Sequence, residues 1–169
     1  LLGARIVVTA RGAEKLARAR ELGAPHGILY NQGDFVRAAR EATQGEGVDV
    51  VFDHVGGETF ERSLKLLKRG GRIVLCGATS GAEAKINLRA LFFKQLSVLG
   101  STMGSLAELM ALLPYFASGE LRPVVDRTFA LAEAPAAQEF LARRGAFGKL
   151  VLTVGTGARD VPRPRETPA

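Results

Sequence analysis

Residue types that build disulfides, metal centres and membrane spans are scarce in this sequence. Its 169 residues include one cysteine, two histidines and no tryptophan. A single cysteine excludes an internal disulfide and a zinc site built from cysteine pairs within these residues. No apolar run approaches the roughly 20 residues of a membrane-spanning helix, and residues 1–5 lack the layout of a secretory signal. We therefore expect a cytoplasmic protein, with no membrane partner and no metal ligated by these residues.

Apolar residues are plentiful, and positive charge is in excess. Hydrophobic residues make up 47% of the chain and charged residues 24%, which suits one soluble domain or a domain plus a fragment of another. The formal net charge is +6, but the arginines are scattered along predicted helices and no aromatic-rich basic stripe accompanies them. We expect no nucleic-acid binding. Part of the excess charge fits cations that face a phosphorylated ligand.

Short apolar runs alternate with helical patterns, which indicates an α/β fold with helices on both faces of a parallel sheet. Strands are predicted at residues 5–9, 27–30, 48–52, 72–76 and 97–100. Helices are predicted at residues 13–22, 35–42 with Asp34 as N-cap, 58–67, 88–93 and 105–118, the last opened by a Ser105-x-x-Glu108 capping box. A Gly70-Gly71 turn is expected before the fourth strand.

The pattern changes after Gly119. We expect a truncated ligand-binding domain at residues 1–119, with Leu106, Leu109, Met110 and Leu113 of its last helix facing inward and Pro114 kinking that helix. Within residues 120–154 a strand is predicted at 124–129, a helix at 135–143 and a strand at 150–154, and this region is too small to stand alone. Residues 155–169 hold three prolines and little apolar surface, which predicts disorder.

Two successive strand ends are followed by loops of small residues. These are residues 77–81 (GATSG) and 101–105 (STMGS). Open parallel sheets bind ligands at the carboxyl ends of their strands, and small residues let a flat ring come close to the backbone. Each loop alone could be a tight turn, but two at successive strand ends favour a binding site.

Six segments, taken in order, carry a family resemblance. They are residues 3–9 (GARIVVT), 14–23 (EKLARARELG), 47–57 (GVDVVFDHVGG), 70–81 (GGRIVLCGATSG), 92–105 (FFKQLSVLGSTMGS) and 147–153 (FGKLVLT). This set resembles the medium-chain dehydrogenase/reductases, which include zinc alcohol dehydrogenases and zinc-free quinone oxidoreductases. The resemblance implies hydride transfer between a nicotinamide cofactor and a small-molecule alcohol/aldehyde or quinone/enone substrate.

The resemblance also implies what the chain lacks. In that family a strand and a glycine-rich loop precede the strand that matches residues 5–9, and the strand order 3-2-1-4-5-6 puts the first strand in the middle of the sheet. We therefore expect a Rossmann-like doubly wound parallel sheet without its first strand and glycine-rich loop. A C-terminal piece of the catalytic domain, residues 122–154, follows it. We expect a fragment of a longer enzyme.

Site residues follow from the same resemblance. Gly77, Ala78 and Thr79 are expected to line the nicotinamide, and Thr102 and Met103 to present backbone groups to its carboxamide. No catalytic residue is assigned, because the substrate-polarising groups of the family lie upstream. Zinc is expected only if the whole enzyme is of the zinc type, with ligands outside these residues.

Competing interpretations exist for His54, Lys149 and Cys76. His54 and Val55 are expected against the cofactor's ribose and adenine, with His54 structural rather than a proton shuttle. Lys149 matches a residue that closes over the cofactor, and it reads equally well as a solvated lysine before a strand. Cys76, in an apolar strand, is expected in the core rather than as a nucleophile.

The loop after residues 5–9 indicates the cofactor preference. Enzymes that prefer NAD commonly place a carboxylate there, and none occupies residues 9–11. Instead Arg11, Lys15 and Tyr30 resemble the phosphate pocket of NADP-using quinone oxidoreductases. We expect NADP, with NAD as the alternative. The competing interpretation is that Arg11 and Lys15 are solvated charges and that Glu14 pairs locally.

Two other functions are alternatives to a dehydrogenase. A nucleoside-cofactor methyltransferase has a similar strand, helix and Gly-Gly turn, but its sheet closes with an antiparallel hairpin. A cofactor-binding member without enzymatic activity is the other alternative.

We also expect a homodimer through the edge strand at Ser97–Gly100, because exposed Val98 and Leu99 on an unpaired edge invite continuation of the sheet.

Overall fold

The computed structural model describes residues 2–155 and divides the chain into two compact units, Leu1–Leu109 and Met110–Ala169. The division falls inside helix α5 (Leu106–Ala117). The tail predicted to be disordered lies outside the described residues, apart from Gly155. None of the helices in the described part of the chain is long and apolar enough to cross a membrane.

The first unit alternates strands and helices, as the sequence predicts. Its elements are β1 (Val7–Ala10), α1 (Ala13–Glu21), β2 (His26–Leu29), α2 (Phe35–Ala42), β3 (Val48–Asp53), α3 (Gly57–Leu64), β4 (Leu67–Leu75), α4 (Leu88–Phe93), β5 (Ser97–Gly100) and the start of α5. Every predicted element is present, most with ends shifted by one or two residues.

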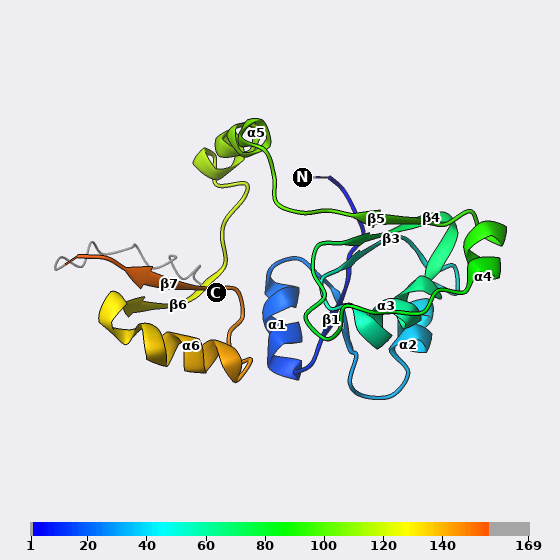
Figure 1. The fold of residues 1–169 in the computed structure, drawn as a ribbon, viewed down its shortest axis with the longest axis horizontal. Coiled ribbons are helices and arrows are strands. Elements are labelled where there is room, and N and C mark those ends of the chain that lie inside the picture. The colour runs from blue at the N-terminus through cyan, green and yellow to red at the C-terminus, as the bar shows by residue number, and fades with distance from the viewer. Residues whose placement is uncertain (1, 156–169) are drawn as a thin grey trace. The chain divides into compact units, whose positions relative to one another are not determined.

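The strands of the first unit form two parallel sheets, β1–β2 and β3–β4–β5 (Figure 1). Within the described residues no ladder joins β1 to β3, so each of these strands pairs on one side alone. All described ladders are parallel, and β5 is followed directly by α5. The antiparallel hairpin expected of a methyltransferase is therefore not found in residues 2–155.

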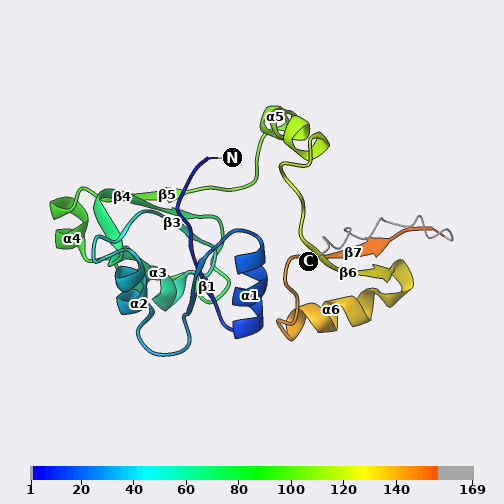
Figure 2. The same ribbon diagram turned by 180° about the vertical axis from the view of Figure 1, so that it is seen from behind.

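Helices α2 and α3 cover one side of the strands of the first unit (Figures 1 and 2), and the core lies on that side. One cluster joins α2 to β2 and the turn after α3 through Ile28, Phe35, Ala39 and Leu66, with Val7 and Val48 packed against it. A second cluster seats Phe60 of α3 on Leu67 and Ile73 of β4. The opposite face of β3 is open, since Val50 is 52% and Phe52 70% exposed.

Two helix starts confirm their predicted caps. The Asp34 carboxylate accepts the Val36 N–H at 3.0 Å, and this hydrogen bond holds the pKa of Asp34 below its ordinary value. At α5 the Ser105 hydroxyl accepts the Glu108 N–H at 3.2 Å while the Glu108 carboxylate accepts the Ser105 N–H at 2.6 Å. The Ser105 hydrogen bonds likewise lower the pKa of Glu108.

Two local predictions are wrong. The predicted turn at Gly70-Gly71 belongs to β4, which begins at Leu67 and contains an irregularity where the register shifts opposite β3. Leu67 is therefore a buried strand residue instead of the end of α3. The bulge carries the extra residues that the sequence pattern placed in a turn.

The inward face predicted for α5 is also not observed. The four residues predicted to face a core are 44–73% exposed. They are Leu106, Leu109, Met110 and Leu113. The helix continues through Pro114 to Ala117. An apolar stripe predicts that a helix needs a partner, but it does not say which segment supplies one.

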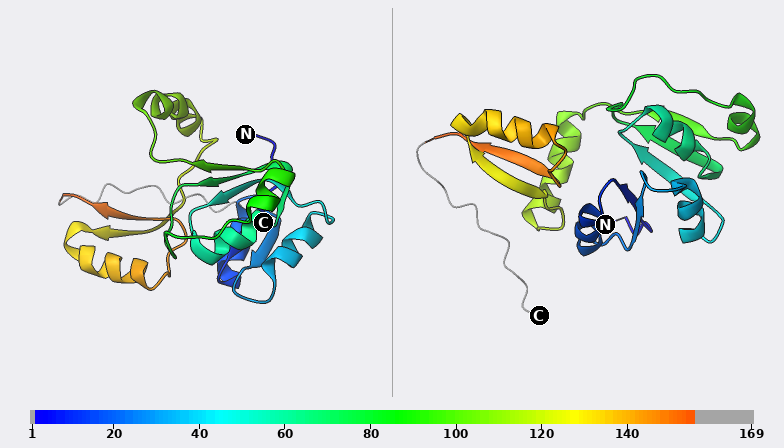
Figure 3. Two further views of the ribbon diagram at one scale, coloured as in Figure 1. Left: turned by 45° about the vertical axis from the view of Figure 1, so that its right-hand side comes forward. Right: turned by 90° about the horizontal axis from the view of Figure 1, so that it is seen from below.

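The second unit contains β6 (Val125–Ala130), α6 (Ala134–Ala142) and β7 (Lys149–Thr153). The two strands pair in parallel, and Figure 3 shows α6 running alongside them. Arg127 stacks its guanidinium 4.1 Å from the centre of the Phe140 ring and so links β6 to α6. All three elements lie within two residues of their predicted positions.

Candidate functional site

Three neighbouring strands end together at one edge of the larger sheet. The register places Asp53 beside Leu75 and Leu75 beside Gly100. The loops that follow β3, β4 and β5 therefore leave the sheet from the same edge. In open parallel sheets this is the edge at which ligands bind.

Two of these loops are joined by hydrogen bonds. Thr79 donates from its backbone N–H and its hydroxyl to the His54 carbonyl, at 3.4 and 3.3 Å. Ser80 donates in the same two ways to the Val55 carbonyl, at 2.8 and 2.9 Å. The predicted residues His54, Val55 and Thr79 are thus brought together, along with Ser80, which the sequence analysis did not select. We refer to residues 54–57 and 77–81 as the paired loops.

The close approach of the paired loops depends on Gly56. Its backbone has φ 75° and ψ −163°, a conformation open almost only to glycine. A Cβ atom at this position would lie 2.7 Å from the Gly81 carbonyl oxygen and 3.0 Å from the Ala78 Cα. A side chain at residue 56 would therefore push the loops apart.

Asp53, the last residue of β3, fixes the first of these loops. Its carboxylate oxygen Oδ1 accepts the N–H groups of Val55 at 2.7 Å and Gly56 at 2.9 Å. The residue is 4% exposed, although its neighbours Phe52 and His54 are exposed. Sequence reasoning missed Asp53. The available signal was an aspartate at a strand end just before a Gly-Gly pair, since aspartate side chains often accept backbone N–H groups two residues ahead.

The second paired loop is open to solvent on its outer side. Residues 76–80 are all exposed, so Gly77, Ala78 and Thr79 present small groups at the surface. Cys76 belongs to this exposed stretch, and its prediction as a core residue is wrong. It lies one residue beyond the end of β4, where the alternation of buried and exposed strand positions no longer applies.

The predicted phosphate-reading residues gather at the end of the smaller sheet. The Tyr30 N–H donates to the carbonyl of Ala10, the last residue of β1, at 3.2 Å. Arg11 follows Ala10 directly and is exposed, and Lys15 lies on the first turn of α1. The structure therefore places Arg11 and Tyr30 at one strand end, with Lys15 four residues along the chain.

The remaining predicted residues are placed less closely. Thr102 and Met103 follow β5, and Met103 has φ 54° and is 96% exposed. Lys149 opens β7 in the second unit, where its backbone N–H donates to the Val124 carbonyl at 2.7 Å. The role of Lys149 at a cofactor stays a prediction.

A groove of about 800 Å³ lies away from these loops, between α2, α3 and α4. Three of its basic side chains are engaged in contacts within the protein. Arg62 pairs with Asp34 at 3.3 Å, and Arg40 and Lys94 donate to backbone carbonyls at 2.7 and 3.0 Å. None of the predicted cofactor residues lines it. Elsewhere in residues 2–155, no three His, Cys, Asp or Glu side chains are grouped as a metal site requires.

Comparisons with known proteins agree with this geometry. Residues 1–118 match the family model of zinc-binding dehydrogenases. The chain is 34% identical over 161 residues to the 2-haloacrylate reductase of a Burkholderia species, covering 89% of this chain and 48% of that protein. It is 35% identical over 160 residues to the quinone oxidoreductase of Pseudomonas aeruginosa, covering 89% and 49%.

A solved structure extends the likeness to the backbone. The crystal structure of an NAD-dependent alcohol dehydrogenase superposes with a TM-score of 0.84 at 41% identity, over 90% of this chain and 45% of that one. The chain thus spans about half the length of the curated relatives it matches.

Proposed function

The chain belongs to the zinc-binding dehydrogenase family of medium-chain dehydrogenase/reductases, and we propose that its paired loops bind NAD or NADP, with residues 77–81 at the nicotinamide. Enzymes of the family use these cofactors. The observation that carries the proposal is the joining of two strand-end loops at the carboxyl edge of a parallel sheet. The whole protein then transfers hydride between the cofactor and an alcohol/aldehyde or a quinone/enone.

The paired loops fit a flat ring. Gly77 has no side chain, and Ala78 and Thr79 are small and exposed, so a ring can lie against their backbone. Thr102 and Met103, beyond the end of β5, are proposed to offer backbone groups to the carboxamide. When bound, the cofactor supplies the carbon that gives or accepts the hydride. These residues orient the ring and exclude water from one of its faces.

Residues around this surface complete the proposed cofactor contacts. Exposed His54 and half-buried Val55 are proposed to lie against the ribose and adenine. Lys149 is proposed to contact the cofactor. The described residues hold no cluster suited to zinc, so a zinc ion in the whole enzyme would need ligands from other residues.

We propose that one further parallel strand fits between β1 and β3. Both strands have one unpaired edge, and Val7 of β1 and Val48 of β3 already pack on the same core cluster. That strand would give a doubly wound sheet, and a covering helix after it would shield the exposed Val50 and Phe52. Its glycine-rich loop would hold the pyrophosphate at a helix N-terminus. The 169 residues alone should then bind NADPH poorly, and micromolar affinity in calorimetry on this chain would contradict the idea.

The cofactor preference proposed here is NADP. Arg11 is exposed beside Tyr30 at the end of the smaller sheet, with no carboxylate at residues 9–11 to repel a 2′-phosphate. Each charge-assisted contact contributes roughly 1.5–3 kcal/mol, or about ten- to a hundredfold in affinity.

A charge reversal tests this preference. Arg11→Asp in the whole enzyme should weaken NADPH about ten- to a hundredfold and leave NADH nearly unchanged. Arg20→Asp, an equal change of charge at the other end of α1, is the matched control and should affect neither cofactor. Equal losses for both cofactors in Arg11→Asp, or a wild-type enzyme that favours NADH, would rule out phosphate recognition by this loop.

The reaction itself is tested by titrating the whole protein with NADPH and following cofactor oxidation with aldehydes and with quinones. Oxidation by either class supports the proposed activity and identifies the substrate class. Tight binding without oxidation by any of them would instead favour a cofactor-binding member without enzymatic activity. Absence of binding would contradict the cofactor site.

We also propose that the whole protein is a homodimer through β5. This strand pairs with β4 on one side, and its Val98 and Leu99 are 38% and 43% exposed. A second copy could continue the sheet across a twofold axis. Light scattering should give a dimer that Val98→Pro dissociates. A wild-type monomer would contradict this interface.

A further inference from the structure

Asp53 is a buried acidic residue at the junction of β3 and the paired loops. Burial of a carboxylate is costly unless hydrogen bonds compensate for the lost water. Here the compensation comes from two backbone N–H groups, those of Val55 and Gly56. No basic side chain of residues 2–155 forms an ion pair with it.

The backbone of Asp53 anchors the residue that leads into the other paired loop. Its carbonyl accepts the Cys76 N–H at 3.0 Å, directly before Gly77. The side chain thus shapes residues 54–57, and the main chain anchors the start of residues 77–81. Asp53 therefore contacts the first loop and the residue just before the second, at the point where both leave the sheet.

The effect of the carboxylate passes through the loop that it shapes. Because Oδ1 holds the N–H groups of residues 55 and 56, the peptide units 54–55 and 55–56 are fixed in direction. The carbonyls of His54 and Val55 then meet the donors of Thr79 and Ser80. Without an acceptor at residue 53, the N–H of buried Gly56 would lack a partner, and the loop would have to rearrange to satisfy it.

We propose that Asp53 is a positioning residue that holds the nicotinamide loop, residues 77–81, in its binding shape through residues 54–57. This inference rests on the proposed cofactor site. Both hydrogen bonds go to one oxygen atom, so geometry rather than negative charge is what the loop requires. The Oδ1 atom of an asparagine can accept the same two N–H groups.

The experiment uses the whole enzyme with three substitutions. Asp53→Leu removes the acceptor while keeping a side chain branched at Cγ, Asp53→Asn keeps the acceptor, and Thr43→Val removes a buried hydroxyl at the other end of β3 as a matched control for lost stability. If Asp53→Leu does not fold, Asp53→Ala replaces it. The readouts are the Kd for NADPH, kcat and KM, the Tm, and amide hydrogen exchange of Thr79 and Ser80.

Asp53→Leu should raise the Kd for NADPH about ten- to a hundredfold and speed amide exchange of residues 79 and 80. Asp53→Asn should stay within about threefold of wild type in both readouts. Thr43→Val should lower the Tm without changing the Kd. The inference is overturned if Asp53→Leu changes the Kd no more than Thr43→Val does, or if Asp53→Asn is as impaired as Asp53→Leu.

The exchange measurement separates this inference from the proposed function. If wild type binds no nicotinamide cofactor, the proposed function fails and the cofactor role of Asp53 fails with it. Faster exchange in Asp53→Leu alone would then still show that Asp53 shapes the loop. If wild type binds NADPH and exchange is the same in all variants, the positioning inference fails while the cofactor site stands.

Discussion

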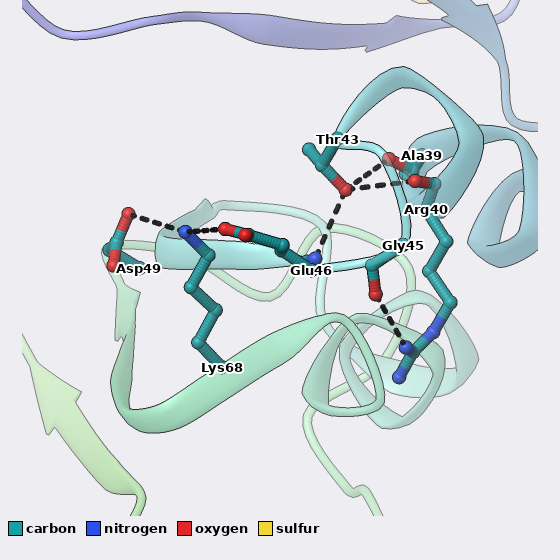
Figure 4. A network of polar contacts seen from close by, with 8 residues as sticks. Ala39, Arg40, Thr43, Gly45, Glu46, Asp49 and Lys68 are labelled. Carbon is teal, nitrogen blue, oxygen red and sulfur yellow. Dashed lines mark hydrogen bonds and ion pairs between the residues drawn. The ribbon is translucent and has the colours of Figure 1, made fainter.

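The two ends of strand β3 are held by different kinds of contact. At the amino end the side-chain contacts of Thr43 are local: its hydroxyl donates to the carbonyls of Ala39 and Arg40 and accepts the Gly47 N–H at 3.1 Å (Figure 4). At the carboxyl end, carbonyl groups of one loop accept hydrogen bonds from the other, and the outer side of the second loop stays exposed.

One strand thus serves two purposes. The turn before β3 is closed, with Thr43 and Gly47 buried and Lys68 bridging Glu46 and Asp49 at the surface (Figure 4). The loop after β3 is closed toward the sheet and open outward, as a ligand surface must be. Changes at the amino end should therefore cost stability alone, and changes at the carboxyl end should also cost cofactor affinity.

The largest expected effect is at the amino end. Gly47 has φ 88°, and a Cβ atom there would overlap the Leu66 carbonyl oxygen. Gly47→Ala should lower the free energy of unfolding by about 2–4 kcal/mol, from backbone strain plus this overlap. Gly45→Ala is the control, because Gly45 has a similar φ of 86° with open space around it. Urea unfolding that finds equal losses for the two variants would show that the overlap is relieved.

The next effect should appear in cofactor affinity. Gly56→Ala should raise the Kd for NADPH at least about tenfold in the whole enzyme, because the added Cβ meets the Gly81 carbonyl and parts the paired loops. Gly70→Ala adds a Cβ atom at a similar φ, 74°, where nothing lies within 4 Å. Calorimetry should find its affinity unchanged. If both variants bind NADPH like wild type, the paired loops do not form the cofactor surface.

Thr43→Val should have a smaller effect, on the free energy of unfolding alone. It removes a buried hydroxyl with three partners, which should cost about 1–3 kcal/mol of unfolding free energy, while KM for the cofactor stays the same. Thr43→Ser keeps the hydroxyl and should recover most of this loss. A higher KM in Thr43→Val with unchanged stability would mean that the two ends of β3 are not independent.

The smallest effect is expected for the ion pairs at the amino end. Lys68 lies 3.1 Å from Glu46 and 3.7 Å from Asp49, whose side chains are 73% and 84% exposed. Lys68→Met should change the free energy of unfolding by less than about 1 kcal/mol, because exposed pairs are screened by water. Thermal unfolding at low and high salt tests this. A loss of several kcal/mol would show that the pairs are stronger than exposed pairs ordinarily are.

Local patterns predicted the backbone elements well. The bounds of α4 and β5 match their predictions, and Asp34 and Ser105 cap helices as their sequence contexts indicate. These features depend on contacts within a few residues, so composition and spacing suffice to find them. The gathering of strand-end loops also followed from the sequence, because parallel strands joined by helices end at a common edge.

Contacts between distant residues could not be read in this way. Ser80 meets Val55 across 25 positions, and Asp53 is buried because two backbone N–H groups turn toward it. The exposure of Cys76 and of the apolar face of α5 likewise depends on what packs against them, which residue type does not state.

The sequence by itself thus determined the alternation of strands and helices, the parallel order and the family, because each depends on local periodicity or on motifs in sequence. Only the tertiary structure decided that residues 54–57 and 77–81 join, that Gly56 admits no side chain, and that Asp53 holds the junction. These outcomes depend on distances of about 3 Å between separate segments, which only the packing of the strands fixes.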